Sequence, residues 1–171
     1  MKPLKRSTRR SVLVAHVAVS VSWLGLTVGL LALGLTALLA QDATAAQAAT
    51  RAMKVFADWL IVPVALLSLV SGLVLALGTP WGLARHRWVW TKFWLTSIAT
   101  ALSVFSLRPG INEAAARGAA DVDLVIAPAV ATATYFFITA ISVLKPWGPT
   151  RRGRRLRMTT GTAARADTHV S

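Results

Sequence analysis

The chain contains no cysteine, which excludes disulfide bonds, iron–sulfur ligation and thiol catalysis. Only three histidines are available to bind a metal, and one of them, His169, lies close to the C-terminus. The three methionines lie outside the long apolar stretches, which disfavours a copper site. The sequence shows no nucleotide-binding loop, catalytic triad, zinc motif or pair of catalytic carboxylates. Nothing in it points directly to an enzyme active site.

Acidic residues are scarce as well, with six Asp and Glu against 19 Lys and Arg, and the net charge is +13. Four apolar stretches of about 20 residues or more are almost free of charge, and a helix of that length crosses a bilayer. They are residues 12–40, 56–78, 88–107 and 122–144. We therefore predict an all-α protein in which residues 12–144 form an integral membrane four-helix antiparallel bundle.

The basic residues are concentrated in the N-terminal segment 1–11, the short segment 79–87 and the C-terminal tail 145–171, which we expect to be disordered. Cytoplasmic segments carry an excess of Lys and Arg, so we predict a multi-pass protein of the cytoplasmic membrane with both termini inside. Segments 41–55 and 108–121 would face outward as loops with short Ala-rich helical turns. Because the charge flanks apolar stretches, its expected partner is the bilayer with its anionic headgroups and not nucleic acid.

Polar and small residues recur at helical spacing on one face of two predicted spans. They are His16, Ser20, Trp23, Thr27 and Gly34 in the first span, and Lys92, Thr96, Ala99, Ser103 and Ser106 in the third. These faces are predicted to point into the bundle, while Trp90 and Trp94 point toward lipid. Small residues four apart, as at Gly25 and Gly29, allow close helix approach, either within one bundle or in a homo- or hetero-oligomer.

His16 and Lys92 are the ionisable side chains that fall within these two spans. At about 1.5 Å per residue, counted from Arg10 and Arg87, both lie about 7–9 Å inside the cytoplasmic boundary. An ionisable side chain at such a depth is a candidate functional residue. Two alternatives stay open. Lys92 can extend to the headgroups, and a neutral His16 can bond to Ser20 or to a nearby carbonyl.

Arg85, His86 and Arg87 form a basic rim beside this pair, where the simplest partner of His86 is a lipid phosphate. A flat apolar cofactor with carboxylates at one edge, such as haem b, would fit the pair and the rim together. His16 would then ligate the iron, and the two arginines would bind the propionates. Lys92 would be a sixth ligand or a charge partner of a propionate.

The segments "HVAVSVSW" and "PWGLARHRWVWTKFW" resemble those of a family of small actinobacterial integral membrane proteins of unknown function. That family is in turn similar to the four-helix membrane protoporphyrinogen oxidases and to the copper-resistance D membrane domain. The resemblance covers about residues 12–107. It implies a four-helix membrane fold, and it implies that His16, Trp23 and Lys92 occupy the positions of the oxidase family's first-span histidine and tryptophan and third-span lysine.

The segment "RAMKVFADWL" departs from the oxidase pattern because it lacks that family's arginine pair. The more modest implication is therefore haem or porphyrin binding without turnover. Within this segment Lys54 and Asp58 are four residues apart, and we predict that they form an ordinary ion pair at the outer surface.

Two classes of function remain open on the sequence alone. The first is a non-enzymatic integral membrane component that packs with a partner or binds lipid. The alternative is a haem- or porphyrin-binding membrane redox protein that uses His16 and Lys92. If the protein is an enzyme, the resemblance implies a porphyrin- or haem-linked oxidoreductase.

Reporter fusions test the predicted threading. Fusions after residues 47 and 115 are expected to report an external position, because these segments carry little net positive charge. A fusion after Leu83 is expected to report a cytoplasmic position. An external signal at Leu83 would overturn both the threading and the shared depth of His16 and Lys92.

Overall fold

The computed structural model describes residues 5–78, 87–118 and 121–144. Every regular element in these residues is a helix, and the helices form four rods. The first rod is α1 (Arg6–Leu39), and the last is α6 (Asp123–Leu144). The second rod is continuous and consists of α2 (Ala43–Val55), the π-helical segment η1 (Phe56–Ile61) and α3 (Val62–Gly78). The third consists of α4 (Arg87–Leu102), the π-helical segment η2 (Ser103–Leu107) and α5 (Arg108–Arg117).

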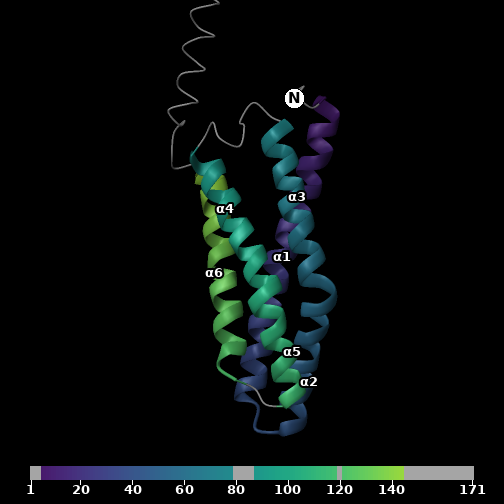
Figure 1. Cartoon of the computed structure of the whole chain (residues 1–171), viewed down its shortest axis with the longest axis vertical. Coiled ribbons are helices and arrows are strands. Elements are labelled where there is room, and N and C mark those ends of the chain that lie inside the picture. The colour runs from purple at the N-terminus through teal and green to yellow at the C-terminus, as the bar shows by residue number, and fades with distance from the viewer. Residues whose placement is uncertain (1–4, 79–86, 119–120, 145–171) are drawn as a thin grey trace, which may run out of the picture.

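Each rod runs antiparallel to the one before it in the sequence (Figure 1). The start of α1, the end of α3, the start of α4 and the end of α6 lie at one end of the bundle, which we call the α3–α4 end. The helices α2 and α5 lie at the opposite end, the α2–α5 end. α1 packs against α2 and α3 of the second rod and against α6, the last rod.

Three of the described helices are long and apolar enough to cross a membrane: α1, the continuous helix Ala43–Gly78, and α6. The predicted third span, residues 88–107, is helical but is not among them. Its tryptophans, its lysine and its hydroxyl side chains make it less apolar than the other three. The length and composition of the helices therefore support three of the four predicted spans directly.

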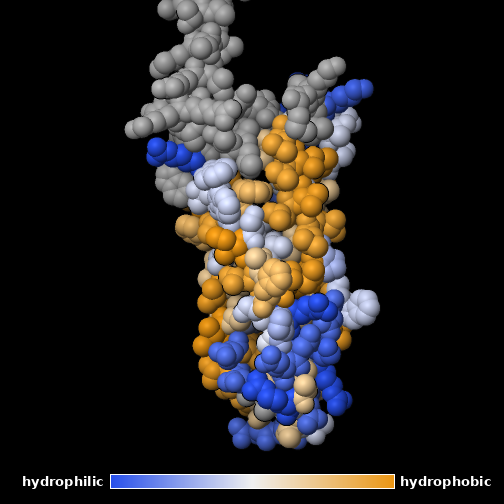
Figure 2. Space-filling model, viewed as in Figure 1, coloured by the Kyte–Doolittle hydropathy of each residue, from blue (hydrophilic) through white to orange (hydrophobic). Residues whose placement is uncertain are grey.

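The outer surface of the rods is largely apolar. Phe105 is 80% exposed and Val14 is 69% exposed, and many other large aliphatic side chains face outward. Figure 2 shows hydrophobic residues over α3 and α6, and hydrophilic residues over α2 and α5 at the other end. Trp90 and Trp94 are exposed, as predicted. An apolar exterior of this kind is expected where lipid surrounds helices whose backbone groups are already bonded within each helix.

Segments 41–55 and 108–121 are mostly helical and continue the second and third rods. Asp42 caps α2 by accepting a hydrogen bond from the backbone N of Thr44 at 3.1 Å, and the alanines that follow favour a helix. α5 ends at Gly118, whose positive φ of 65° suits glycine. The helix Ala43–Gly78 has 36 residues. It is therefore about 54 Å long, which exceeds the roughly 30 Å hydrocarbon core of a bilayer.

The π-helical segments change which face of a rod is buried, because a π turn holds more residues than an α turn. On α1 the predicted inward face is confirmed, since Trp23 and Gly34 are buried. On the third rod the predicted face holds as far as Ser103, which is buried, but Ser106 is exposed. The next buried position after Ser103 is Leu107, because η2 begins at Ser103 and shifts the register.

The core is built around α1. Trp23 is 1% exposed, and its ring lies 4.4 Å from that of Tyr135 on α6, measured between centroids. Met53, Ile61 and Ile111, from the second and third rods, are buried in the same cluster. All four rods therefore contribute to one core, which fixes their arrangement.

Two glycines of α1 permit close contact with other rods. A Cβ at Gly29 would lie 3.1 Å from the ring of Phe56, and a Cβ at Gly34 would overlap the backbone carbonyl of Leu124. A Cβ at Gly25 would meet nothing within 4 Å. Gly29 is therefore packed inside the bundle, whereas Gly25 faces outward.

Replacing Gly34 with Ala is expected to destabilise the bundle by about 1–3 kcal/mol, because the added methyl would force α1 away from α6. Gly25→Ala is the matched control. It is expected to be neutral, or to stabilise α1 by up to about 1 kcal/mol through its higher helix propensity. Thermal unfolding in detergent, followed by circular dichroism, measures both variants. Equal stability of the two would contradict the close contact at Gly34.

Candidate functional site

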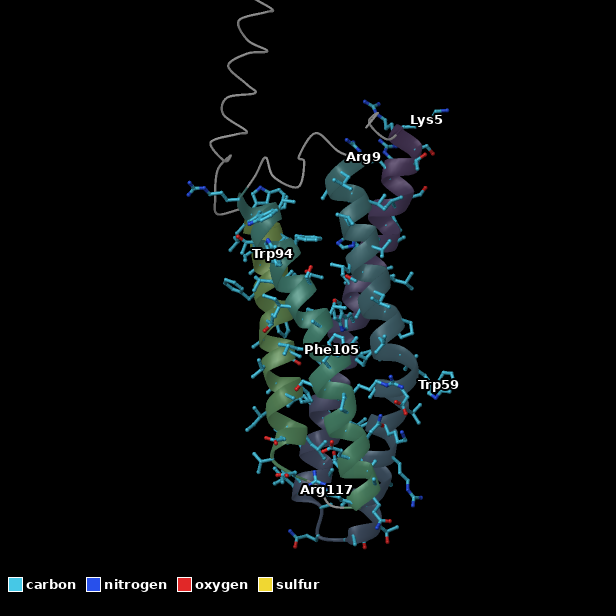
Figure 3. All side chains as sticks on the ribbon, in the orientation of Figure 1. Lys5, Arg9, Trp59, Trp94, Phe105 and Arg117 are labelled. Atoms are coloured by element: carbon cyan, nitrogen blue, oxygen red, sulfur yellow. The ribbon has the colours of Figure 1, made fainter. Side chains whose placement is uncertain are left out.

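A cleft of about 540 Å³ lies between α1, α3 and α4 near the α3–α4 end. Most of its lining side chains are apolar and come from α3 and α4. Its polar lining residues are Arg9, His16, Ser68, Lys92 and Thr96. The volume is in the range of small-molecule binding sites. Figure 3 shows Arg9 at the start of α1, at this end of the bundle.

The His16 ring is held between α1 and α3. Its Nδ1 lies 2.9 Å from Ser71 Oγ. Gly72 leaves room for the ring, since a Cβ there would lie 3.1 Å from His16 Cε1. Deeper in the same seam, Ser20 Oγ and Ser68 Oγ are 3.0 Å apart. The histidine is therefore hydrogen-bonded, as one alternative anticipated, but its partner is Ser71 of α3 and not Ser20.

The bonds of Ser71 indicate which nitrogen of His16 carries the proton. A serine hydroxyl has a single hydrogen to donate. The Ser71 hydroxyl lies 2.7 Å from the carbonyl O of Leu67, one turn earlier in α3, and donates to it. With that hydrogen in use, Ser71 Oγ would accept from the Nδ1–H of His16. In this tautomer Nε2 is the unprotonated nitrogen, and it is able to accept a hydrogen bond or to ligate a metal.

Lys92 lines the cleft and is half-buried. Its Nζ lies 5.8 Å from the centroid of the Trp88 ring, within the range of a cation–π contact. It forms no ion pair within residues 5–78, 87–118 and 121–144. Trp23, another candidate, lies deeper, in the core against Tyr135, and does not line the cleft.

Arg9 is the cationic residue of the cleft that the sequence analysis did not single out. It precedes His16 by seven residues, a spacing that places both on the same helix face and that would have identified it. Arg87 is exposed at the start of α4 and does not line the cleft. Arg85 and His86 lie outside the described residues. The structure therefore brings together His16 and Lys92 from the predicted set and adds Arg9.

The charges of the bundle are separated along its length. The acidic residues that the structure describes lie toward the α2–α5 end, at Asp42, Asp58, Glu113, Asp121 and Asp123. Among the described residues that line the cleft, Arg9 and Lys92 are cationic and none is a carboxylate. The described residues hold no group of three or more His, Cys, Asp or Glu side chains that could bind a metal ion. A ligand of this cleft is therefore expected to be an anion with apolar parts.

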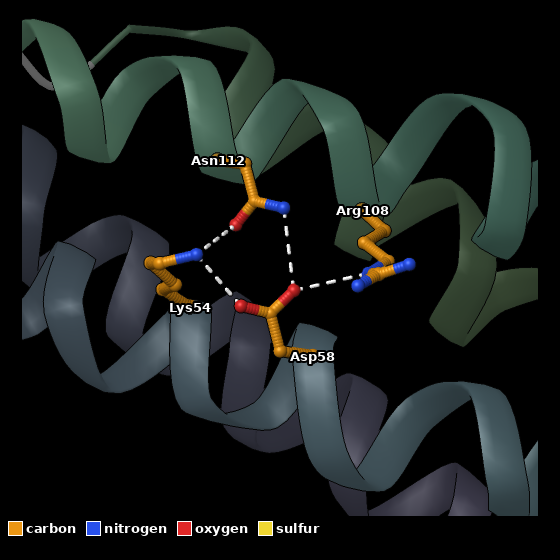
Figure 4. Close-up of polar contacts among 4 residues, drawn as sticks. All are labelled: Lys54, Asp58, Arg108 and Asn112. Atoms are coloured by element: carbon orange, nitrogen blue, oxygen red, sulfur yellow. Dashed lines mark hydrogen bonds and ion pairs between the residues drawn. The ribbon is translucent and has the colours of Figure 1, made fainter.

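A second polar cluster joins the second and third rods (Figure 4). Lys54 Nζ donates to Asp58 Oδ2 at 2.7 Å and to Asn112 Oδ1 at 2.8 Å. Asp58 Oδ1 accepts from Arg108 Nε at 3.0 Å and from Asn112 Nδ2 at 3.2 Å. The predicted ion pair of Lys54 and Asp58 is confirmed. We call these four residues the Asp58 network.

No protein-family model matches the chain, and neither the curated proteins nor the solved structures include one similar enough to indicate a relationship. The resemblance carried by His16, Trp23 and Lys92 therefore stays a prediction.

Proposed function

We propose that this chain is a non-enzymatic, multi-pass protein of the cytoplasmic membrane, with both termini in the cytoplasm, that binds an anionic phospholipid of the inner leaflet in its cleft. The observation that carries the proposal is that the two cations Arg9 and Lys92 share a mostly apolar lining in which no described residue is a carboxylate. A phosphate would lie between the two cations, and acyl chains would lie along the apolar walls.

The distance along each rod from the Asp58 network to the α3–α4 end supports this placement in a bilayer. Asp58 lies about 30 Å from Gly78 along the second rod, and Arg108 lies about 30 Å from Arg87 along the third, at about 1.5 Å per residue. This is about the thickness of the hydrocarbon core of a bilayer. The Asp58 network would then mark the outer boundary, with Trp59, which is 75% exposed and points away from the bundle, beside it (Figure 3).

Native mass spectrometry of the detergent-purified protein tests the lipid proposal. Phosphatidylglycerol is expected to bind more tightly than phosphatidylcholine, because only the former has net negative charge. Lys92→Gln and Arg9→Gln should each weaken phosphatidylglycerol binding about fivefold, which corresponds to about 1 kcal/mol for a cation near a headgroup.

The matched control is Arg10→Gln, which removes a neighbouring cation of α1 that does not line the cleft. It should leave the preference for phosphatidylglycerol largely unchanged. An equal loss in Arg10→Gln and Lys92→Gln would show that the preference reflects surface charge in general and would contradict binding in the cleft.

A second candidate ligand, haem b, is favoured by the state of His16. A metal-ligating histidine commonly donates its other ring N–H to a fixed partner. His16 donates Nδ1–H to Ser71, which leaves Nε2 unprotonated in a side chain that lines the cleft. These residues fit a haem, with His16 as iron ligand and with Arg9 and Lys92 as partners of the propionates. A bound haem would supply one-electron redox chemistry.

The absorbance spectrum of protein expressed with ample haem tests this candidate. A haem site predicts a Soret band that sharpens on reduction, is lost in His16→Ala, and weakens and shifts in Lys92→Ala. The band should also shift in Ser71→Ala, because the ring loses the acceptor that orients it. A colourless protein that takes up neither added haem nor porphyrin would exclude haem binding and leave the lipid proposal standing.

A further inference from the structure

The two ends of the seam between α3 and α4 differ in how the rods are held. At the α3–α4 end the seam contains the cleft, with Gly72 and Ala76 on one side and Lys92 and Thr96 on the other. At the α2–α5 end the same two rods are joined by the Asp58 network (Figure 4). Among the described residues, the seam therefore holds a cleft at one end and is bonded across at the other.

The Asp58 network is closed on itself. Both carboxylate oxygens of Asp58 accept hydrogen bonds, and Asn112 both donates to Asp58 and accepts from Lys54. The Asp58 side chain is 19% exposed, whereas those of Lys54 and Arg108 are each 46% exposed. The carboxylate thus lies beneath two cations that cover it from the two rods. Without it, the cations would face each other with no anion between them.

Both rods change their helix type at the level of this network. Asp58 lies within η1, and Arg108 follows directly after η2. π-Helical turns occur often at functional sites and are points where the bonding register of a helix changes. η1 contacts α5, and η2 contacts α3, so the two segments lie on facing sides of the seam. A change in either segment would move the rods relative to each other at the network.

Buried hydroxyl groups continue from the cleft toward the network. Thr96 lines the cleft, and Thr100 and Ser103, at the following turns of the same rod, are buried with exposures of 6% and 4%. Each of the two donates its hydroxyl to its own helix, at 2.9 Å from Thr96 O and from Ala99 O respectively. Ser103 therefore lies along the third rod between the level of the cleft and that of the network, buried inside the bundle with its hydroxyl beside Tyr135 of α6.

We infer that the Asp58 network is a seal that closes the α2–α5 end of the seam, so that the cleft exchanges its ligand only at the α3–α4 end. The inference rests on the proposed function for the identity of that ligand. The seal itself depends only on the Lys54, Asp58, Arg108 and Asn112 contacts. It gives these residues a role that an isolated surface ion pair would not have.

Cysteine labelling of the full chain in proteoliposomes tests the seal, and the chain has no native cysteine to interfere. Ser103→Cys is the reporter, because it replaces a buried hydroxyl with a thiol of similar size. Thr44→Cys, at an exposed position of α2, identifies the side of the membrane that the α2–α5 end faces. A membrane-impermeant maleimide is added from that side.

The reporter is expected to be protected in the otherwise unchanged protein. Asp58→Asn should raise its labelling rate about tenfold, because local opening exposes buried groups once the contacts that hold them are lost. Glu113→Gln is the matched control, since it removes an exposed carboxylate of α5 that forms no ion pair among the described residues. It should leave the reporter protected.

Ala37→Cys separates opening of the seam from general loosening, because Ala37 is buried in α1, which is neither of the two rods of the seam, with 3% exposure. The seal predicts that Asp58→Asn leaves Ala37→Cys protected. An unchanged Ser103→Cys rate in Asp58→Asn would overturn the inference, and so would equal exposure of both thiols. None of these measurements requires a ligand, so a failure of the proposed lipid or haem binding is distinguished from a failure of the seal.

Discussion

The contact between α1 and α3 fixes the position of the cleft and of its most reactive side chain. Two hydrogen-bonded pairs, His16–Ser71 and Ser20–Ser68, lie along this contact at 2.9 and 3.0 Å. A polar group in an apolar surrounding is costly unless it is bonded, so these pairs hold the two rods in one register. Because Gly72 has no side chain, the imidazole fits against α3 and presents its edge to the cleft.

Charge separation along the bundle then determines what the cleft can accept. Along the third rod, Lys92 lies about 24 Å from Arg108, which bonds Asp58, at about 1.5 Å per residue, so Asp58 is too far away to neutralise it. A lysine held in an apolar environment is most stable when an anion accompanies it. The proposed phospholipid and the proposed haem both bring an acidic group attached to a large apolar body. Either proposed ligand would bring the anion that the cations of the cleft need, and an unprotonated Nε2 of His16 would favour the haem over the lipid.

The sequence alone was sufficient for the features that depend on composition and regular spacing. The inward face of α1 followed from the helical period, and the pair of Lys54 and Asp58 followed from its i, i+4 spacing. Ser106 was misplaced because a π-helical turn has no clear signal in the sequence, and one extra residue per turn rotates everything after it. Arg108 and Asn112 were missed because they reach Asp58 across two rods, about 50 residues apart in the chain.

The shape of the bundle follows from where small and large residues meet. Toward the α2–α5 end, Gly29 admits Phe56 and Gly34 admits the backbone at Leu124, so α1 lies close to its neighbours. At the start of α4 two large side chains, Trp88 and Phe93, line the cleft, and they face Gly72 and Ala76 of α3. Small residues instead bring α1 close to its neighbours toward the α2–α5 end. The cleft therefore lies where large side chains of α4 meet small residues of α3.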